Sequence, residues 1–161
     1  MRSVAKMMRA VTLLEHGPAS SLFVREVKVP APDLAQNQLL IHVKAAGINP
    51  VDTYIRAGTN NYKAIFPHTP GRDGAGIVIS APSGSEFAAG ERVYFSSCIT
   101  GSAAEYTVCS AAHTFPLPSC LSFEEGACLG VPYITAHRAL GRCQAKAGDR
   151  VLIHGATGAV G

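Results

Sequence analysis

The sequence VLIHGATGAVG, residues 151–161, joins a short apolar run directly to a glycine-rich turn. Its first residues, Val151, Leu152 and Ile153, predict a buried strand of the kind found in parallel sheets. A strand that leads at once into glycines is typical of the first unit of a dinucleotide-binding α/β domain, because glycine lets the backbone approach a pyrophosphate. The stretch favours dinucleotide binding, and a simple structural turn stays open as the alternative.

Two helices are predicted immediately before this stretch. Residues 122–125 read Ser-Phe-Glu-Glu, the form of a capping box, and predict a helix that continues through residues 126–129. Pro132 suits the first turn of a second helix, with Ile134 and Leu140 among its apolar positions. This part of the chain is therefore expected to be mixed helix and strand.

The earlier part of the chain is predicted to be rich in strands. Short apolar or alternating segments are separated by glycine and proline, as in barrels and sandwiches built from many short strands. The predicted strands cover residues 9–14, 22–29, 38–46, 75–80, 92–96 and 104–109. One helix interrupts them, with Asn49 as a suitable N-cap, Pro50 in its first turn and Gly58 as its stop.

The bulk composition predicts a packed globular protein. Of the 161 residues, 47% are hydrophobic and 16% are charged, which argues against disorder. The net charge of +3 is scattered along the chain, unlike the basic stripe of a dedicated nucleic-acid binder.

The cellular compartment is predicted from the cysteines and the hydropathy pattern. The five cysteines lack a C-x-x-C pair and are expected to be reduced thiols in a cytoplasmic protein. No apolar run approaches the roughly 20 residues of a membrane span. The basic start of the chain is not followed by an apolar segment, so a secretory signal is not expected.

Several sequence blocks in order resemble one superfamily. Among them are AGINPVDTYIRAG at residues 46–58, TPGRDGAG at 69–76 and GVPYITA at 130–136. Shorter blocks are found at residues 8–11, 90–93 and 104–106, and the last is the glycine stretch itself. With these blocks the chain resembles the medium-chain dehydrogenase/reductase superfamily, and within it the quinone oxidoreductases of the zeta-crystallin type.

The resemblance implies a mainly β fold with flanking helices. Residues 1–125 would form a GroES-like β-barrel catalytic domain. Residues 126–161 would be the first strand and glycine loop of a truncated Rossmann α/β domain that binds NADPH. The active site would lie in the cleft between the two parts.

The resemblance also implies a set of site residues. Asn49 and Tyr54 would be catalytic and line the substrate site, and Tyr54 would also touch the cofactor. The other cofactor-binding residues would be Thr135, Thr157, Gly158, Ala159 and Val160. Simpler roles remain open: Asn49 as a helix cap, Tyr54 as a core residue, and Thr135 as a hydroxyl bonded to its own helix.

The resemblance further implies chemistry without zinc. Zinc-dependent members carry Cys, His and Glu where this chain has Asn49, Arg72 and Asp73. A catalytic zinc needs three strong protein ligands and an open position, so no metal is expected. Many members of the branch also have a second Tyr soon after the position of Gly58; here Tyr62 is the candidate to replace it.

The expected function of the parent protein is NADPH-dependent reduction of quinones or related electrophilic enones and carbonyls. The alternative is a truncated, inactive chain with a structural, crystallin-like role or with RNA binding, the latter suggested by the family alone. The family also implies a homo-oligomer, a dimer or tetramer, at full length. No membrane partner is expected.

Overall fold

The computed structural model describes residues 6–161, so the first five residues of the basic start lie outside the described part. Its strands are β1 (Met7–Thr12), β2 (Phe23–Lys28), β3 (Gln38–Gly47), β4 (Asp73–Ser80), β5 (Arg92–Phe95), β6 (Tyr106–Ser110) and β7 (Thr114–Pro116). Its α-helices are α1 (Pro50–Ala57), α2 (Phe123–Ala127) and α3 (Val131–Arg142). Six of these strands overlap the six predicted ones, and the mainly β fold is confirmed.

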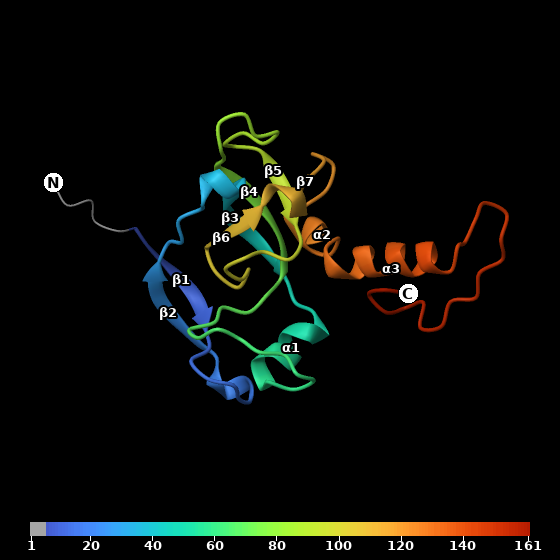
Figure 1. Ribbon diagram of the computed structural model, residues 1–161, viewed down its shortest axis with the longest axis horizontal. Coiled ribbons are helices and arrows are strands. Elements are labelled where there is room, and N and C mark those ends of the chain that lie inside the picture. Colours follow the sequence, from blue (N-terminus) through green and yellow to red (C-terminus); the bar gives the residue numbers. More distant parts are fainter. Residues whose placement is uncertain (1–5) are drawn as a thin grey trace.

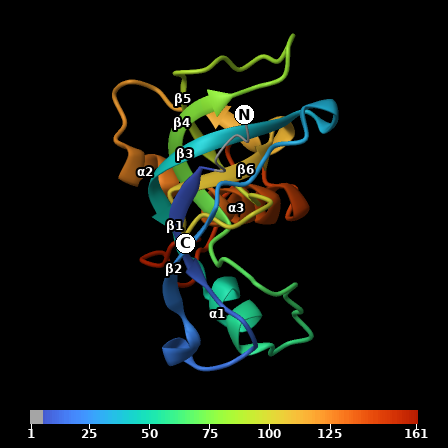
Figure 2. The ribbon, with the colours of Figure 1, turned by 90° about the vertical axis from the view of Figure 1, so that its left-hand side faces the viewer.

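The strands form two antiparallel sheets. The larger has the order β6-β3-β4-β5-β7, and β1 and β2 form a separate two-stranded ribbon. The long strand β3 pairs with both β4 and β6, and it curves across the sheet in Figure 2. Register shifts in its pairing with β4 accompany this bend, as expected for β-bulges.

The hydrophobic core lies against the large sheet. Its fully buried members include Leu39 and Ile41 from β3, Val78 from β4, and Val93 and Phe95 from β5. These residues are spaced by two along each strand, so one face of the sheet carries them together. The ribbon is less buried: every residue of β2 is at least partly exposed.

Helix α1 follows β3 and begins and ends where the sequence predicts. The backbone N–H of Asn49 donates to the carboxylate of Asp52 at 2.8 Å, which ties down the first turn. Gly58 has φ of +68°, the left-handed conformation that glycine adopts without a steric penalty. The ends of α1 are therefore set by local chemistry.

Beyond the sheet, the chain continues through α2 into α3, which extends to one side in Figure 1, with the last residues turning back beside it. The predicted strand at residues 151–153 was wrong, because these residues form no strand. Val151, Leu152 and Ile153 are 53%, 81% and 54% exposed. The predicted first helix also ends at Ala127, two residues earlier than expected.

Candidate functional site

Asp73 is the polar centre of the site. It is the first residue of β4 and is completely buried. Its Oδ2 atom accepts a hydrogen bond from Asn49 Nδ2 at 2.8 Å and another from the backbone N–H of Val131 at 2.6 Å. One carboxylate oxygen therefore joins β4, the start of α1 and the start of α3.

The surroundings of Asp73 leave no spare room. A Cβ atom added at Gly130 would lie 2.3 Å from the carboxyl carbon of Asp73, and one added at Gly47 would lie 3.0 Å from its Cβ. The absence of side chains at these two positions lets the backbone approach the carboxylate closely. The close approach brings the N–H of Val131 within hydrogen-bonding distance.

A second buried carboxylate, Asp52, lies in the first turn of α1. Burial raises the pKa of Asp52, and the negative charge of Asp73 raises it further, while the hydrogen bond from the Asn49 backbone opposes both. Within residues 6–161, neither Asp52 Oδ1 nor Asp73 Oδ1 has a hydrogen-bond partner. The two buried carboxylates therefore repel each other near the start of α1.

A cavity of about 830 Å³ opens beside this centre. Its walls come from the start of α1, one side of α3 and the turned-back residues 151–161, and most of them are apolar. Of the predicted site residues, it brings together Asn49, Gly158, Ala159 and Val160. Asn49 supplies one of the few polar side chains of this wall and is only 6% exposed.

The other predicted site residues lie elsewhere. Tyr54 is 41% exposed on α1 and stacks on Tyr62, with 6.4 Å between the ring centroids. The hydroxyl of Thr135 donates to the carbonyl of Val131 at 2.6 Å, the bond to its own helix that the sequence left open. Thr157 is exposed in the turned-back segment. None of the three predicted residues lines the 830 Å³ cavity.

Arg72 precedes Asp73 in the chain, but its side chain lies at a different cavity from the 830 Å³ one. Its guanidinium donates to Ser97 Oγ at 3.1 Å, and it lines a second cavity of about 480 Å³ together with Cys98. Among residues 6–161, no three His, Cys, Asp or Glu side chains gather in a way that would hold a metal ion. Asn49 and Asp73 are instead joined directly by a hydrogen bond.

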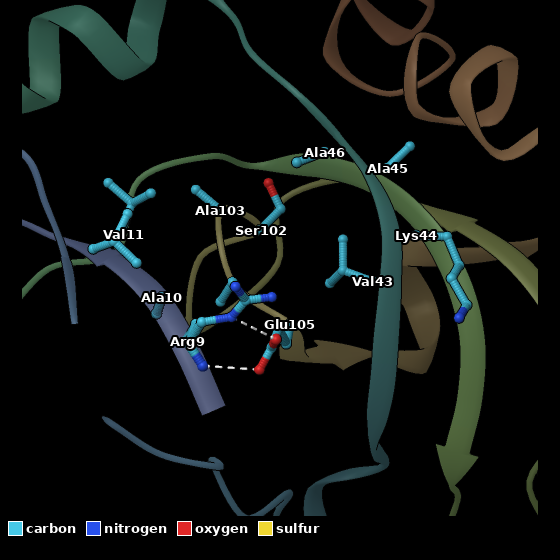
Figure 3. A pocket seen from close by; sticks show the side chains of 12 residues that line it. Arg9, Ala10, Val11, Val43, Lys44, Ala45, Ala46, Ser102, Ala103 and Glu105 are labelled. Carbon is cyan, nitrogen blue, oxygen red and sulfur yellow. Dashed lines mark hydrogen bonds and ion pairs between the residues drawn. The ribbon is translucent and has the colours of Figure 1, made fainter. Parts of the chain in front are cut away.

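A third, shallow cavity lies between the ribbon and the sheet (Figure 3). Its volume is about 430 Å³, and its lining includes Val43 and Lys44 of β3 and an ion pair between Arg9 and Glu105 at 3.0 Å. It contains none of the predicted site residues. The 830 Å³ cavity is therefore the candidate site.

Sequence reasoning missed the central role of Asp73. The residue was noted only as a position where zinc-dependent relatives have Glu, and its partners are 24 and 58 residues away in the chain. The available signal was an acidic residue at the start of an apolar strand and between two glycine-rich turns. Such a residue must either face solvent or have buried hydrogen-bond donors.

Comparison with known proteins places the chain in a family. Residues 35–119, just over half of the chain, match the family described as "Alcohol dehydrogenase GroES-like domain". The chain belongs to this family. The GroES-like barrel predicted from the motifs is confirmed, and residues 35–119 cover strands β3 to β7 of the large sheet.

Relatives of this GroES-like domain include quinone oxidoreductases, as the motifs predicted. The rat quinone oxidoreductase is 46% identical over 164 residues, covering 100% of this chain and 49% of the relative. A solved quinone oxidoreductase from Pseudomonas syringae has a TM-score of 0.84 at 29% identity, covering 95% of this chain and 47% of that one. The chain thus spans about half the length of the relatives it matches.

A third match includes a cofactor in its description. It is a mycobacterial protein solved in complex with NADPH, with a TM-score of 0.79 at 29% identity, covering 88% of this chain and 44% of that one. In the described part of the chain, no helix has the length and hydrophobicity that crossing a membrane requires.

Proposed function

We propose that the chain forms the catalytic barrel and the first cofactor contacts of an NADPH-dependent quinone reductase that works without zinc. The observation that carries the proposal is the cavity shared by Asn49 and residues 158–160. Its volume of about 830 Å³ is within the range of pockets that hold organic ligands, roughly 300–1,000 Å³. The family relationship to quinone oxidoreductases supports the same reading.

Asn49 is the proposed electrophilic residue. Its Nδ2 group has two N–H bonds, and one of them donates to Asp73 at 2.8 Å. The other is free to donate to the carbonyl oxygen of a quinone at the cavity wall. Because the donor is buried and held by a carboxylate, it is oriented before the substrate arrives, which is how fixed donors stabilise developing negative charge.

The glycine loop is proposed to hold the phosphates of the dinucleotide. Gly155 has φ of +71°, and a Cβ added at Gly161 would clash with the carbonyl oxygen of Gly155, so these two positions require glycine. The proposed contacts are Thr157, Gly158, Ala159 and Val160, with Tyr54 and Thr135 as proposed contacts farther along the cofactor. The bound NADPH supplies reducing equivalents, while the protein holds and orients the substrate.

The absence of zinc from the chemistry is part of the proposal. Asn49 and Arg72 stand where the resemblance implies Cys and His ligands, and neither side chain is a strong zinc ligand. A hydrogen-bond donor at Asn49 would then take over the polarisation that a metal supplies elsewhere. Assembly into dimers or tetramers, RNA binding and a cytoplasmic location stay predictions.

Two measurements test the proposal. The first is a fluorescence titration of the chain with NADPH, in which saturable micromolar binding would exclude the reading of an inactive fragment. The second joins residues 1–161 to the part of the rat quinone oxidoreductase that the alignment does not cover, and follows NADPH oxidation with an ortho-quinone. A folded chimera that neither binds NADPH nor reduces the quinone would overturn the proposal.

Variants of the chimera separate the proposed roles. Asn49→Ala should lower kcat about 100-fold, the effect of removing one fixed donor to a developing oxyanion. The matched control is Glu86→Ala, which changes an exposed carboxylate outside the 830 Å³ cavity. Zinc content is measured alongside by elemental analysis, and activity that follows bound zinc would contradict the zinc-free mechanism.

A further inference from the structure

Cys98 and Cys109 lie near each other in the barrel, because Cys98 packs against the core cluster that contains Cys109. Cys109 belongs to β6 and is completely buried, while Cys98 follows β5 and is partly exposed. The segment containing Cys98 runs beside β6, because the N–H of Ile99 donates to the carbonyl of Val108 at 2.8 Å. Residues 97–101 form a loop and not a strand, and this bond holds the loop against β6 near Cys109.

The neighbouring threonines also join this loop to β6. The hydroxyl oxygens of Thr100 and Thr107 are 3.2 Å apart, and the N–H of Val108 donates to the Thr100 hydroxyl at 2.9 Å. Cys98 also packs against the buried core cluster that includes Cys109.

A disulfide requires two cysteines to be near neighbours, with Cα atoms about 4.4–6.8 Å apart. The hydrogen bonds of Ile99 and Thr100 to β6, together with the packing of Cys98 on the cluster that contains Cys109, keep the two cysteines near each other.

We propose that Cys98 and Cys109 form a reversible dithiol–disulfide pair that reacts with hydroperoxides. Cys98 is the thiol that reacts with the peroxide because it lines the 480 Å³ cavity, whereas Cys109 is buried in the core. The thiolate of Cys98 attacks a peroxide oxygen, the O–O bond breaks, and Cys98 becomes a sulfenic acid. Cys109 then attacks that sulfur, the S–S bond forms, the S–O bond breaks, and the hydroxyl leaves as water with the proton of Cys109. In total, two thiols and one hydrogen peroxide give one disulfide and two waters.

The electrostatics agree with this order of events. The neighbouring thiol of Cys109 lowers the pKa of Cys98 from its ordinary value, although burial opposes the shift. Burial raises the pKa of Cys109 well above its ordinary value. The reactive thiolate is therefore expected at Cys98 and the resolving thiol at Cys109.

The test uses the chain with its three exposed cysteines, Cys120, Cys128 and Cys143, changed to serine. The protein is treated with hydrogen peroxide, alkylated under denaturing conditions and digested with a protease that cleaves after glutamate. Glu105 lies between the two cysteines, so cleavage after Glu91, Glu105 and Glu124 puts them on separate peptides, 92–105 and 106–124. We expect these peptides joined, with the loss of two hydrogen atoms, and released by a dithiol reductant.

Two controls keep the result interpretable. In Cys109→Ala, the sulfenic acid of Cys98 should persist and be trapped by a dimedone reagent; circular dichroism shows whether this variant folds. The unsubstituted chain, digested in the same way, covers the case in which the serine variant does not fold; because peptide 106–124 then holds Cys120 as well as Cys109, fragmentation of the joined peptides in the mass spectrometer assigns the bridge. The proposal is overturned if both cysteines are recovered as alkylated thiols, if Cys98 is overoxidised while Cys109 stays free, or if the peptides are joined only in a covalent dimer.

Discussion

Replacing Asp73 with alanine should destabilise the fold severely, and the magnitude follows from its two hydrogen bonds. The substitution leaves Asn49 Nδ2 and the N–H of Val131 without their acceptor. A hydrogen bond to a charged group contributes about 1.5–3 kcal/mol, so the two amount to about 3–6 kcal/mol. Removing a buried charge relieves part of its desolvation cost, and we expect a net loss of about 2–4 kcal/mol in the free energy of unfolding.

The matched comparison is Asp73→Asn, which keeps an acceptor oxygen in the same shape and should cost only about 1 kcal/mol. Urea unfolding followed by far-UV circular dichroism measures both variants, with Glu86→Ala as the exposed control. In a double-mutant cycle, Asn49→Ala and Asp73→Ala should couple by about 1–2 kcal/mol. If Asp73→Ala costs no more than Glu86→Ala, or if the cycle shows no coupling, the assignment of Asp73 as the centre of the site is refuted.

Further predictions concern packing and pH. Gly130→Ala should lower the free energy of unfolding by about 1–3 kcal/mol, because the added Cβ would clash with Asp73. Gly141→Ala is the matched control in α3, where the added Cβ meets no other atom, and it should raise the free energy of unfolding by about 0.5–1 kcal/mol. The midpoints of urea unfolding compare the two variants. Burial lowers the pKa of His68, so the unfolded state binds more protons and stability falls as the pH drops below 6.5 through the folded-state pKa; His68→Gln should reduce this loss in urea titrations. The raised pKa of Asp52 has the opposite sign: its contribution is present below the ordinary value of 3.8 and lost as the pH rises through the folded-state pKa. Asp52→Asn should therefore increase stability at neutral pH relative to the unsubstituted chain, measured by thermal unfolding.

The parts of the fold that could be predicted from sequence are those set by nearby residues. Strand periodicity, the Asn49 start of α1 and its Gly58 stop depend on residues within a few positions of one another, and all are observed. The run at residues 151–153 shows the limit of this reasoning. Its apolar residues satisfy the composition of a strand, but a strand also needs a hydrogen-bonding neighbour that composition does not reveal.

The site shows the same limit more sharply. Asn49 was expected at the site because it belongs to a sequence block that resembles the family. The acceptor that holds Asn49 was not expected, since Asp73 reaches Asn49 and Val131 only after the sheet and α3 have formed. Tyr62 is an intermediate case: sequence reasoning raised it as a substitute for a missing aromatic, and the structure stacks it on Tyr54.

The Asp73 carboxylate determines more than the position of Asn49. An ionised carboxylate only accepts hydrogen bonds, so the amide of Asn49 must turn its nitrogen, and not its oxygen, toward Asp73. The same Oδ2 atom accepts from the first residue of α3, which also lines the 830 Å³ cavity. The same oxygen atom therefore fixes both the orientation of the Asn49 amide and the position of the first residue of α3. A shift of α3 when a ligand fills the cavity would change the hydrogen bonding of Asn49, so the residue proposed to polarise the substrate is mechanically linked to the helix that lies beside the proposed cofactor loop.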